Sequence, residues 1–155
     1  MSKPVLLALS SFRRDTAEIE EALATCEETG APLVAVFVVD INLARYFADS
    51  GVVAGTSLRE EMEKGVMDKH KAEAQEALDL VAKLAAERNV PCRTEMRVGR
   101  FAIEVRDLVE QIAPAVLIVT RAGRPDWLRR LFGSPVDRLC EELQGTCEIR
   151  IVRKR

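Results

Sequence analysis

Gly123 and Gly133 enclose nine residues, and Ser134-Pro135 follows the second glycine at once. The run 115–120 that precedes them is apolar enough to predict a buried strand. Ser134 and Pro135 are typical of a helix start, where a hydroxyl caps the backbone and proline's fixed φ is tolerated. Free backbone N–H groups and the helix dipole favour negative charge at such a strand, loop and helix junction. The chemistry indicated is the binding of a phosphate group.

The elements that must position this loop follow from the hydrophobic pattern. Short apolar runs alternate with helical patterns, which favours a parallel sheet with helices on its faces. Strands are expected at Val5–Ser10, Pro32–Val39, Cys92–Val98, Ala115–Thr120 and Thr146–Arg153. Helices are expected from Asp15 to Gly30, from Ser57 to Asn89, over Arg100–Ile112 and from Ser134 to Gly145.

The predicted helix from Ser57 to Asn89 is longer than a small sheet needs, about 48 Å at 1.5 Å per residue. Its later half carries apolar residues at helical spacing from Ala74 to Ala85. Gly65 therefore marks either a bend or a first half that projects. His70 lies in a charged stretch of this helix and is expected to be a solvated surface residue.

The composition predicts one domain over residues 1–155. With 48% hydrophobic and 31% charged residues, the chain supports one full core and is too short for two ordinary domains. A formal net charge of −2 gives no basic surface for a nucleic acid or an anionic membrane. No apolar run is long enough for a membrane span or a signal peptide core. We expect a cytoplasmic protein with neither nucleic acid nor membrane as a partner.

The cysteines and the single histidine give no metal site. Cys26, Cys92, Cys140 and Cys147 contain no C-x-x-C pair. This spacing excludes the usual zinc motifs and favours reduced packing residues over a disulfide framework.

The order of elements and the loop together resemble the universal stress protein family over nearly the whole chain. ATP-binding members of that family carry G-x-x-G-x9-G-[ST], and the matching stretch here is Thr120-Arg-Ala-Gly123, nine residues, then Gly133-Ser134. The stretches V-L-L-A-L-S-S, V-A-V-F-V-V-D and V-G-R-F-A-I-E-V also match. The resemblance implies a Rossmann-like, three-layer α/β sandwich with a five-stranded parallel sheet in the order 3-2-1-4-5. Its ligand crevice would lie between the first and fourth strands.

The resemblance also implies an ATP site, with Mg²⁺ as an optional companion. In ATP-binding relatives the adenine and ribose lie by the ends of the first and second strands, and the phosphates lie along the glycine loop. The matching positions here are Ser10, Val39, Thr120, Gly123, Arg124, Gly133 and Ser134. Arg124 is one of four arginines in or near the loop, and guanidinium groups suit phosphate oxygens.

Three positions depart from the pattern of ATP-binding relatives. Ser10 stands where they usually have an acidic residue, so it would contact a nucleotide without charge. Thr120 replaces the first glycine of the motif, and its Cβ restricts the backbone. Pro135 has no N–H to offer a phosphate. Two hypotheses therefore stay open: a nucleotide-binding regulatory module in stress response, and a nucleotide-independent, dimeric protein-interaction module.

An enzyme is the least favoured class, and no catalytic residue is predicted. Phosphoryl transfer needs a carboxylate that holds a metal and a group that orients the nucleophile. Asp126 is the only acid inside the loop, and the G-x-x-x-x-G-K-[ST] motif is absent. Slow hydrolysis of bound ATP is the most catalysis expected.

The family resemblance further implies a homodimer in which the last strands of two subunits pair. Glu148 and Arg150 lie in that strand, where relatives tend to be apolar. In an antiparallel pair they could meet as opposite charges across the two-fold axis, or they could block the pairing. We expect a homodimer through the C-terminal strand and a protein partner that the sequence does not name.

Overall fold

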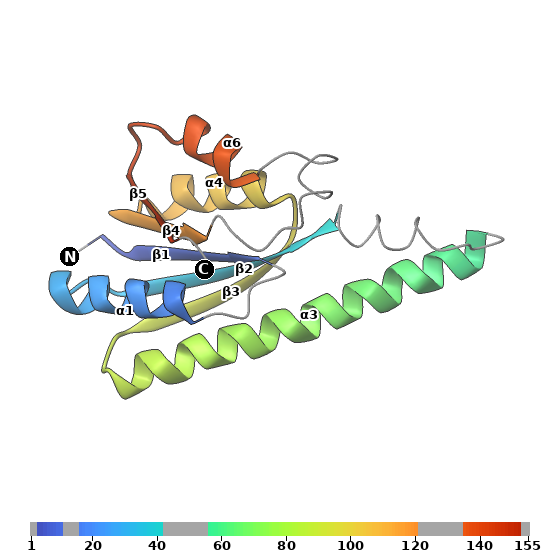
Figure 1. Cartoon of the computed structure of the whole chain (residues 1–155), viewed down its shortest axis with the longest axis horizontal. Coiled ribbons are helices and arrows are strands. Elements are labelled where there is room, and N and C mark those ends of the chain that lie inside the picture. Colours follow the sequence, from blue (N-terminus) through green and yellow to red (C-terminus); the bar gives the residue numbers. More distant parts are fainter. Residues whose placement is uncertain (1–2, 11–15, 42–55, 121–134, 153–155) are drawn as a thin grey trace.

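The computed structural model describes residues 3–10, 16–41, 56–120 and 135–152 (Figure 1). The strands are β1 (Val5–Ser10), β2 (Leu33–Asp40), β3 (Cys92–Gly99), β4 (Val116–Thr120) and β5 (Glu148–Val152). The helices are α1 (Ala17–Thr29), α3 (Thr56–Glu87), α4 (Phe101–Ile112) and α6 (Pro135–Glu142). The predicted alternation of strands and helices is confirmed, with most ends within one or two residues of those expected.

The five strands form one parallel sheet in the order β3-β2-β1-β4-β5, as predicted. The central strands β1, β2 and β4 are the continuous apolar runs of the sequence, and helices cover both of their faces. β3 and β5 are the sheet edges and carry more polar, partly exposed residues. The fold class is therefore the α/β sandwich that the element order indicated.

Alternate residues of the central strands point into two separate cores, because successive side chains leave opposite faces of a strand. Leu7 and Leu9 of β1 pack with α1 and α3, whereas Leu6 and Ala8 pack with α4 and α6. Figure 1 shows the two pairs of helices on opposite sides of the sheet. The layers are thus α1 and α3, the sheet, and α4 and α6.

Glycine ends α1 as the sequence predicted. Gly30 has φ 72°, in the left-handed region, and its N–H donates to the carbonyl of Cys26 at 2.8 Å. The helix begins at Ala17, with Thr16 before it, and Thr16 makes no side-chain capping bond. Asp15, the predicted start, lies outside the described residues.

α3 is one continuous helix of 32 residues that passes through Gly65. Its later part covers β2 and β3, and Figure 1 shows its first turns extending beyond the end of the sheet. Of the two alternatives for Gly65, the projecting first half is the one observed.

Candidate functional site

Three of the predicted nucleotide contacts lie together at the carboxyl edge of the sheet. Ser10 and Thr120 end β1 and β4, and Val39 is the penultimate residue of β2. The register brings these ends together: Ser10 pairs with Val38, and Ala8 pairs with Val119. The four loop positions, Gly123, Arg124, Gly133 and Ser134, lie outside the described residues.

The helices that follow β1 and β4 lie on opposite faces of the sheet. After β1 the chain enters α1, whose Ile19 and Leu23 belong to one core, and after β4 it reaches α6, whose Leu139 belongs to the other. β1 and β4 are neighbours in the sheet. A reversal of this kind opens a crevice outside the carboxyl ends of the two strands, where open α/β sheets bind ligands. The structure therefore has a switch point between the first and fourth strands, where the sequence predicted one.

Ser10, Val39 and Thr120, the three described candidate positions, differ in what they present at this edge. Ser10 is half-buried, so its hydroxyl is partly accessible. Val39 and Thr120 are 0% and 3% exposed, which places their side chains in the interior. Val39 and Thr120 would therefore present backbone rather than side-chain atoms to a ligand, and Ser10 is the one whose side chain is partly open to it.

His70 is a buried residue at this edge, which corrects the prediction of a solvated surface position. It is only 9% exposed, and it lies four residues before Ala74 on the face of α3 that packs against the sheet. Burial lowers the pKa of His70, and the negative charges of Glu73 and Asp40 oppose that shift. The sequence could have predicted this burial, because His70 lies one helical turn before Ala74 and so continues the spacing of the apolar stripe.

Asp40 ends β2 and is a buried acid, only 5% exposed. α3 packs against β2, and the negative charge of Asp40 at the end of β2 favours the protonated form of His70. Among the described residues, no group of three or more His, Cys, Asp or Glu side chains is arranged to hold a metal ion.

The cysteines are all free thiols, and three of them have raised pKa values. Burial raises the pKa of Cys26 to about 11, and the neighbouring Cys92 adds to the shift. Burial also raises the pKa of Cys92 and of Cys147. These three thiols are protonated near neutral pH and are poor nucleophiles, which fits the packing role expected from the sequence.

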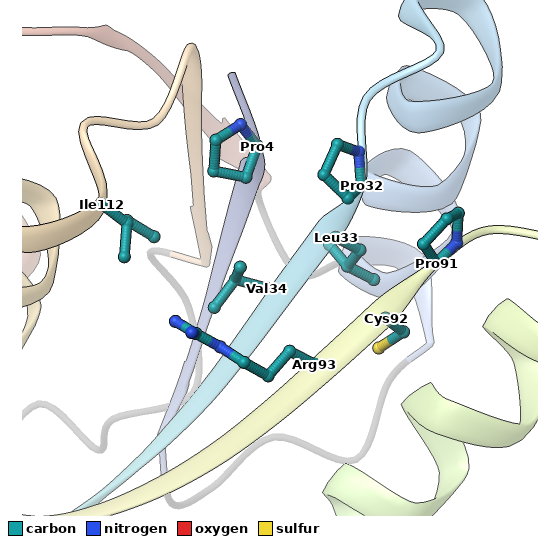
Figure 2. A pocket seen from close by; sticks show the side chains of 8 residues that line it. All are labelled: Pro4, Pro32, Leu33, Val34, Pro91, Cys92, Arg93 and Ile112. Atoms are coloured by element: carbon teal, nitrogen blue, oxygen red, sulfur yellow. The ribbon is translucent and has the colours of Figure 1, made fainter. Parts of the chain in front are cut away.

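A shallow hollow of about 360 Å³ lies at the opposite, amino edge of the sheet. Prolines precede β1, β2 and β3 there, and Figure 2 shows Pro4, Pro32 and Pro91 around the opening with Arg93 extending from β3. The carbonyl oxygens of these prolines accept backbone hydrogen bonds. Ala115 N–H donates to Pro4 at 2.9 Å, Val5 N–H to Pro32 at 2.9 Å and Leu33 N–H to Pro91 at 2.8 Å. Since proline has no N–H, this edge offers few donors to a ligand. The hollow lies at the opposite end of the strands from the switch point between β1 and β4.

Comparison with known proteins shows to which family a chain with this fold belongs. The model of the universal stress protein family matches residues 1–144. The chain belongs to the universal stress protein family. No curated protein matches it. The described part of this family member contains no helix with the length and apolar character of a membrane span.

Solved structures of universal stress proteins share the fold at low sequence identity. UspA from Lactobacillus plantarum aligns with a TM-score of 0.73 at 18% identity, covering 99% of each chain. A universal stress protein from Archaeoglobus fulgidus in complex with dAMP aligns with a TM-score of 0.58 at 14% identity, covering 96% of this chain and 95% of that one. A family protein from Arabidopsis thaliana with AMP bound aligns with a TM-score of 0.56 at 15% identity, covering 99% of this chain and 92% of that one.

Proposed function

We propose that this chain is a nucleotide-binding regulatory module of the universal stress protein family that binds an adenine nucleotide, with ATP as the expected ligand, and acts in the stress response. The observation that carries the proposal is the switch point between β1 and β4, with Ser10, Val39 and Thr120 at its rim. The AMP and dAMP complexes of fold relatives support the adenine part of it.

The roles in the proposed site divide between the sheet edge and the glycine loop. The Ser10 hydroxyl would donate a hydrogen bond to the ribose or the base, and the backbone at Val39 would contact the adenine. The loop would hold the phosphates through backbone N–H groups and the guanidinium of Arg124. The proposed contacts are Ser10, Val39, Thr120, Gly123, Arg124, Gly133 and Ser134.

Binding, rather than turnover, is the proposed output of this site. A bound nucleotide would link the ends of β1, β2 and β4 to the loop that follows β4, and so change the surface offered to a partner. Mg²⁺ would accompany ATP through the phosphate oxygens, which are its usual ligands. No side chain of the described edge is proposed as a catalyst.

The test is to purify the protein without added nucleotide, denature it, and identify any released small molecule. Calorimetric titration of the emptied protein with AMP, and with ATP in the presence and absence of Mg²⁺, follows. We expect saturable binding of at least one adenine nucleotide. If nothing is released and neither nucleotide binds at millimolar concentration, the nucleotide proposal is wrong.

A homodimer through β5 is the second part of the proposal. Among the described residues β5 pairs with β4 alone, and in the proposed dimer its other edge would pair with the same strand of a second copy. Ile149 and Ile151 are half-buried on the α6 side of the sheet, where a partner strand would cover them further. If nucleotide binding fails, this edge favours the alternative function, a nucleotide-independent interaction module.

A further inference from the structure

His70 lies within the interface between α3 and the carboxyl end of β2. Ala74, Leu78 and Val81 follow it on the same face of α3, and all three are buried against the sheet. His70 is 9% exposed and is the first described residue of this stripe to be fully buried. Met67, three residues earlier, is half-buried against the same core, whereas Lys64 and Gly65 are exposed. His70 and Met67 therefore form the last anchored turn before the projecting part of the helix.

The imidazole of His70 is incompletely satisfied in this interface. Its Nδ1 atom is buried, and within the described part of the chain it has no hydrogen-bond partner. A buried polar atom without a partner costs free energy, and a charge on the same ring would cost more because the ring could not be solvated. The interface therefore accommodates a neutral imidazole better than a protonated one.

The charged groups around His70 do not cancel that cost. Glu73 and Lys69 flank it on α3 with opposite signs, and Asp40 approaches it from β2. α1 places Glu18, a buried acid, on the same face of the sheet. The charged side chains of β3 face away, since Arg97 bonds Glu104 of α4 at 3.3 Å. Although acids lie nearby, burial of the imidazole is the main cause of its lowered pKa.

We propose that His70 makes the docking of α3 on β2 sensitive to protons, so that protonation loosens the helix at the carboxyl edge of the sheet. The neutral ring packs as part of the stripe, and the charged ring favours a more solvated position. Because the proposed nucleotide crevice lies at the same edge, protonation would also weaken nucleotide binding. That last step rests on the proposed function, whereas the loosening of α3 does not.

The sign of the pH dependence follows from linkage. Burial lowers the pKa of His70 below its ordinary value of about 6.5. Between that lowered pKa and about 6.5 the unfolded chain binds more protons than the folded one, so stability falls as pH falls through this window. Each pH unit of the window reduces the folding equilibrium constant about tenfold. Below the folded-state pKa the loss stops.

The wild-type chain allows a direct measurement, because His70 is its only histidine. The imidazole C–H resonance in an NMR titration reports this one side chain. We expect a midpoint below 6.5 and, on going from about pH 7 to about pH 5.5, faster amide exchange in residues 66–74 than in residues 81–87, after correction for intrinsic rates. A midpoint at or above 6.5, or equal acceleration in both segments, overturns the proposal.

His70→Gln and His70→Leu provide the matched variants. Neither side chain titrates, so the drop in melting temperature between about pH 7 and about pH 5.5 should shrink in both relative to wild type. Leucine also removes the unpaired nitrogen, so His70→Leu should melt higher than wild type at about pH 7. An unchanged pH dependence in the two variants overturns the proposal. The wild-type NMR result decides it if a variant fails to fold.

AMP titration at the same two pH values separates this proposal from the proposed function. Weaker binding at the lower pH in wild type, and not in His70→Gln, supports the coupling to the nucleotide site. Equal affinity at both pH values in wild type rules that coupling out. If AMP binds at neither pH, the proposed AMP site is wrong, and the exchange and melting results in nucleotide-free protein still decide whether His70 controls α3.

Discussion

In the proposed site, Ser10 is the side chain at the described edge on which we expect recognition to depend most. It is half-buried at the end of β1, whereas the side chains of Val39 and Thr120 are interior. In ATP-binding relatives an acid usually occupies the matching position, so Ser10 offers a neutral hydrogen bond in place of a charged one. A neutral bond contributes less to binding than a charge-assisted one, which predicts modest affinity.

Ser10→Ala should weaken AMP binding about three- to tenfold, the loss of one neutral hydrogen bond. Thr146→Ala is the control, because it removes a hydroxyl at the opposite edge of the sheet, from an exposed turn before β5. Calorimetric titration of both variants measures the difference. Equal affinities would show that Ser10 makes no contact with the nucleotide.

Gly99 and Gly65 should respond in opposite directions to alanine. A Cβ at Gly99 would lie 2.5 Å from Oε1 and 2.9 Å from Cγ of Glu104, so the Glu104 side chain must shift, and its 3.3 Å ion pair with Arg97 is disturbed. We expect Gly99→Ala to destabilise the protein by about 1 kcal/mol. Nothing lies within 4 Å of a Cβ at Gly65, so Gly65→Ala should stabilise α3 by about 0.5–1 kcal/mol.

Denaturant unfolding of the two glycine variants tests this contrast. In a double-mutant cycle, Gly99→Ala should cost less in a Glu104→Ala background, because the side chain it displaces is gone. Additive effects of the two substitutions would contradict the contact.

At the scale of the element, the described side chains of α3 pack on the sheet through one face. Leu78 is 2% exposed and Leu80 is 38% exposed, although they are two residues apart in the same helix. Leu78→Ala should cost about 3 kcal/mol, or roughly 6–12 °C in melting temperature, through lost burial and a cavity. Leu80→Ala should stay within about 0.5 kcal/mol of wild type. Similar losses for both would mean that the outer face of α3 is also buried in solution.

Periodicity predicted the elements well because local pattern and tertiary burial agree in them. β1 begins and ends where its apolar run does, and Gly30 ends α1 because only a residue tolerant of positive φ fits there. The prediction failed at His70, whose polar type masked its place in the buried stripe of α3. Sequence periodicity also could not predict the partners of Arg150, because Glu21 and Thr25 lie far from Arg150 in the sequence. The glycine loop itself lies outside the described residues, so its four site positions remain predictions.

At the scale of the whole molecule, the charges of β5 are already paired within one chain. Arg150 Nη1 donates to Thr25 Oγ1 at 3.0 Å and to Glu21 Oε1 at 3.4 Å, and its Nε donates to Glu148 Oε1 at 3.4 Å. The hypothesis that Glu148 and Arg150 meet across a two-fold axis is therefore not needed to satisfy them. Strand pairing through the backbone, with Ile149 and Ile151 on the α6 side, remains the proposed contact.

Light scattering at micromolar concentration should give twice the 17.2 kDa of the chain. Because the charged side chains of β5 have partners within their own subunit, this mass should not change at high salt. A mass of one chain would rule out the dimer under those conditions. A dimer that dissociates in salt would show that charge pairs between subunits hold it.

The central claim is that an adenine nucleotide binds across the carboxyl edge of the sheet, at the switch point between β1 and β4. Amide NMR of the isotope-labelled protein during AMP titration tests it most directly. We predict saturable shifts at Ser10, Val39 and Thr120, with Val5, Leu33 and Val116 at the amino edge unchanged. Shifts confined to the amino edge, or none at saturating AMP, would contradict the claim.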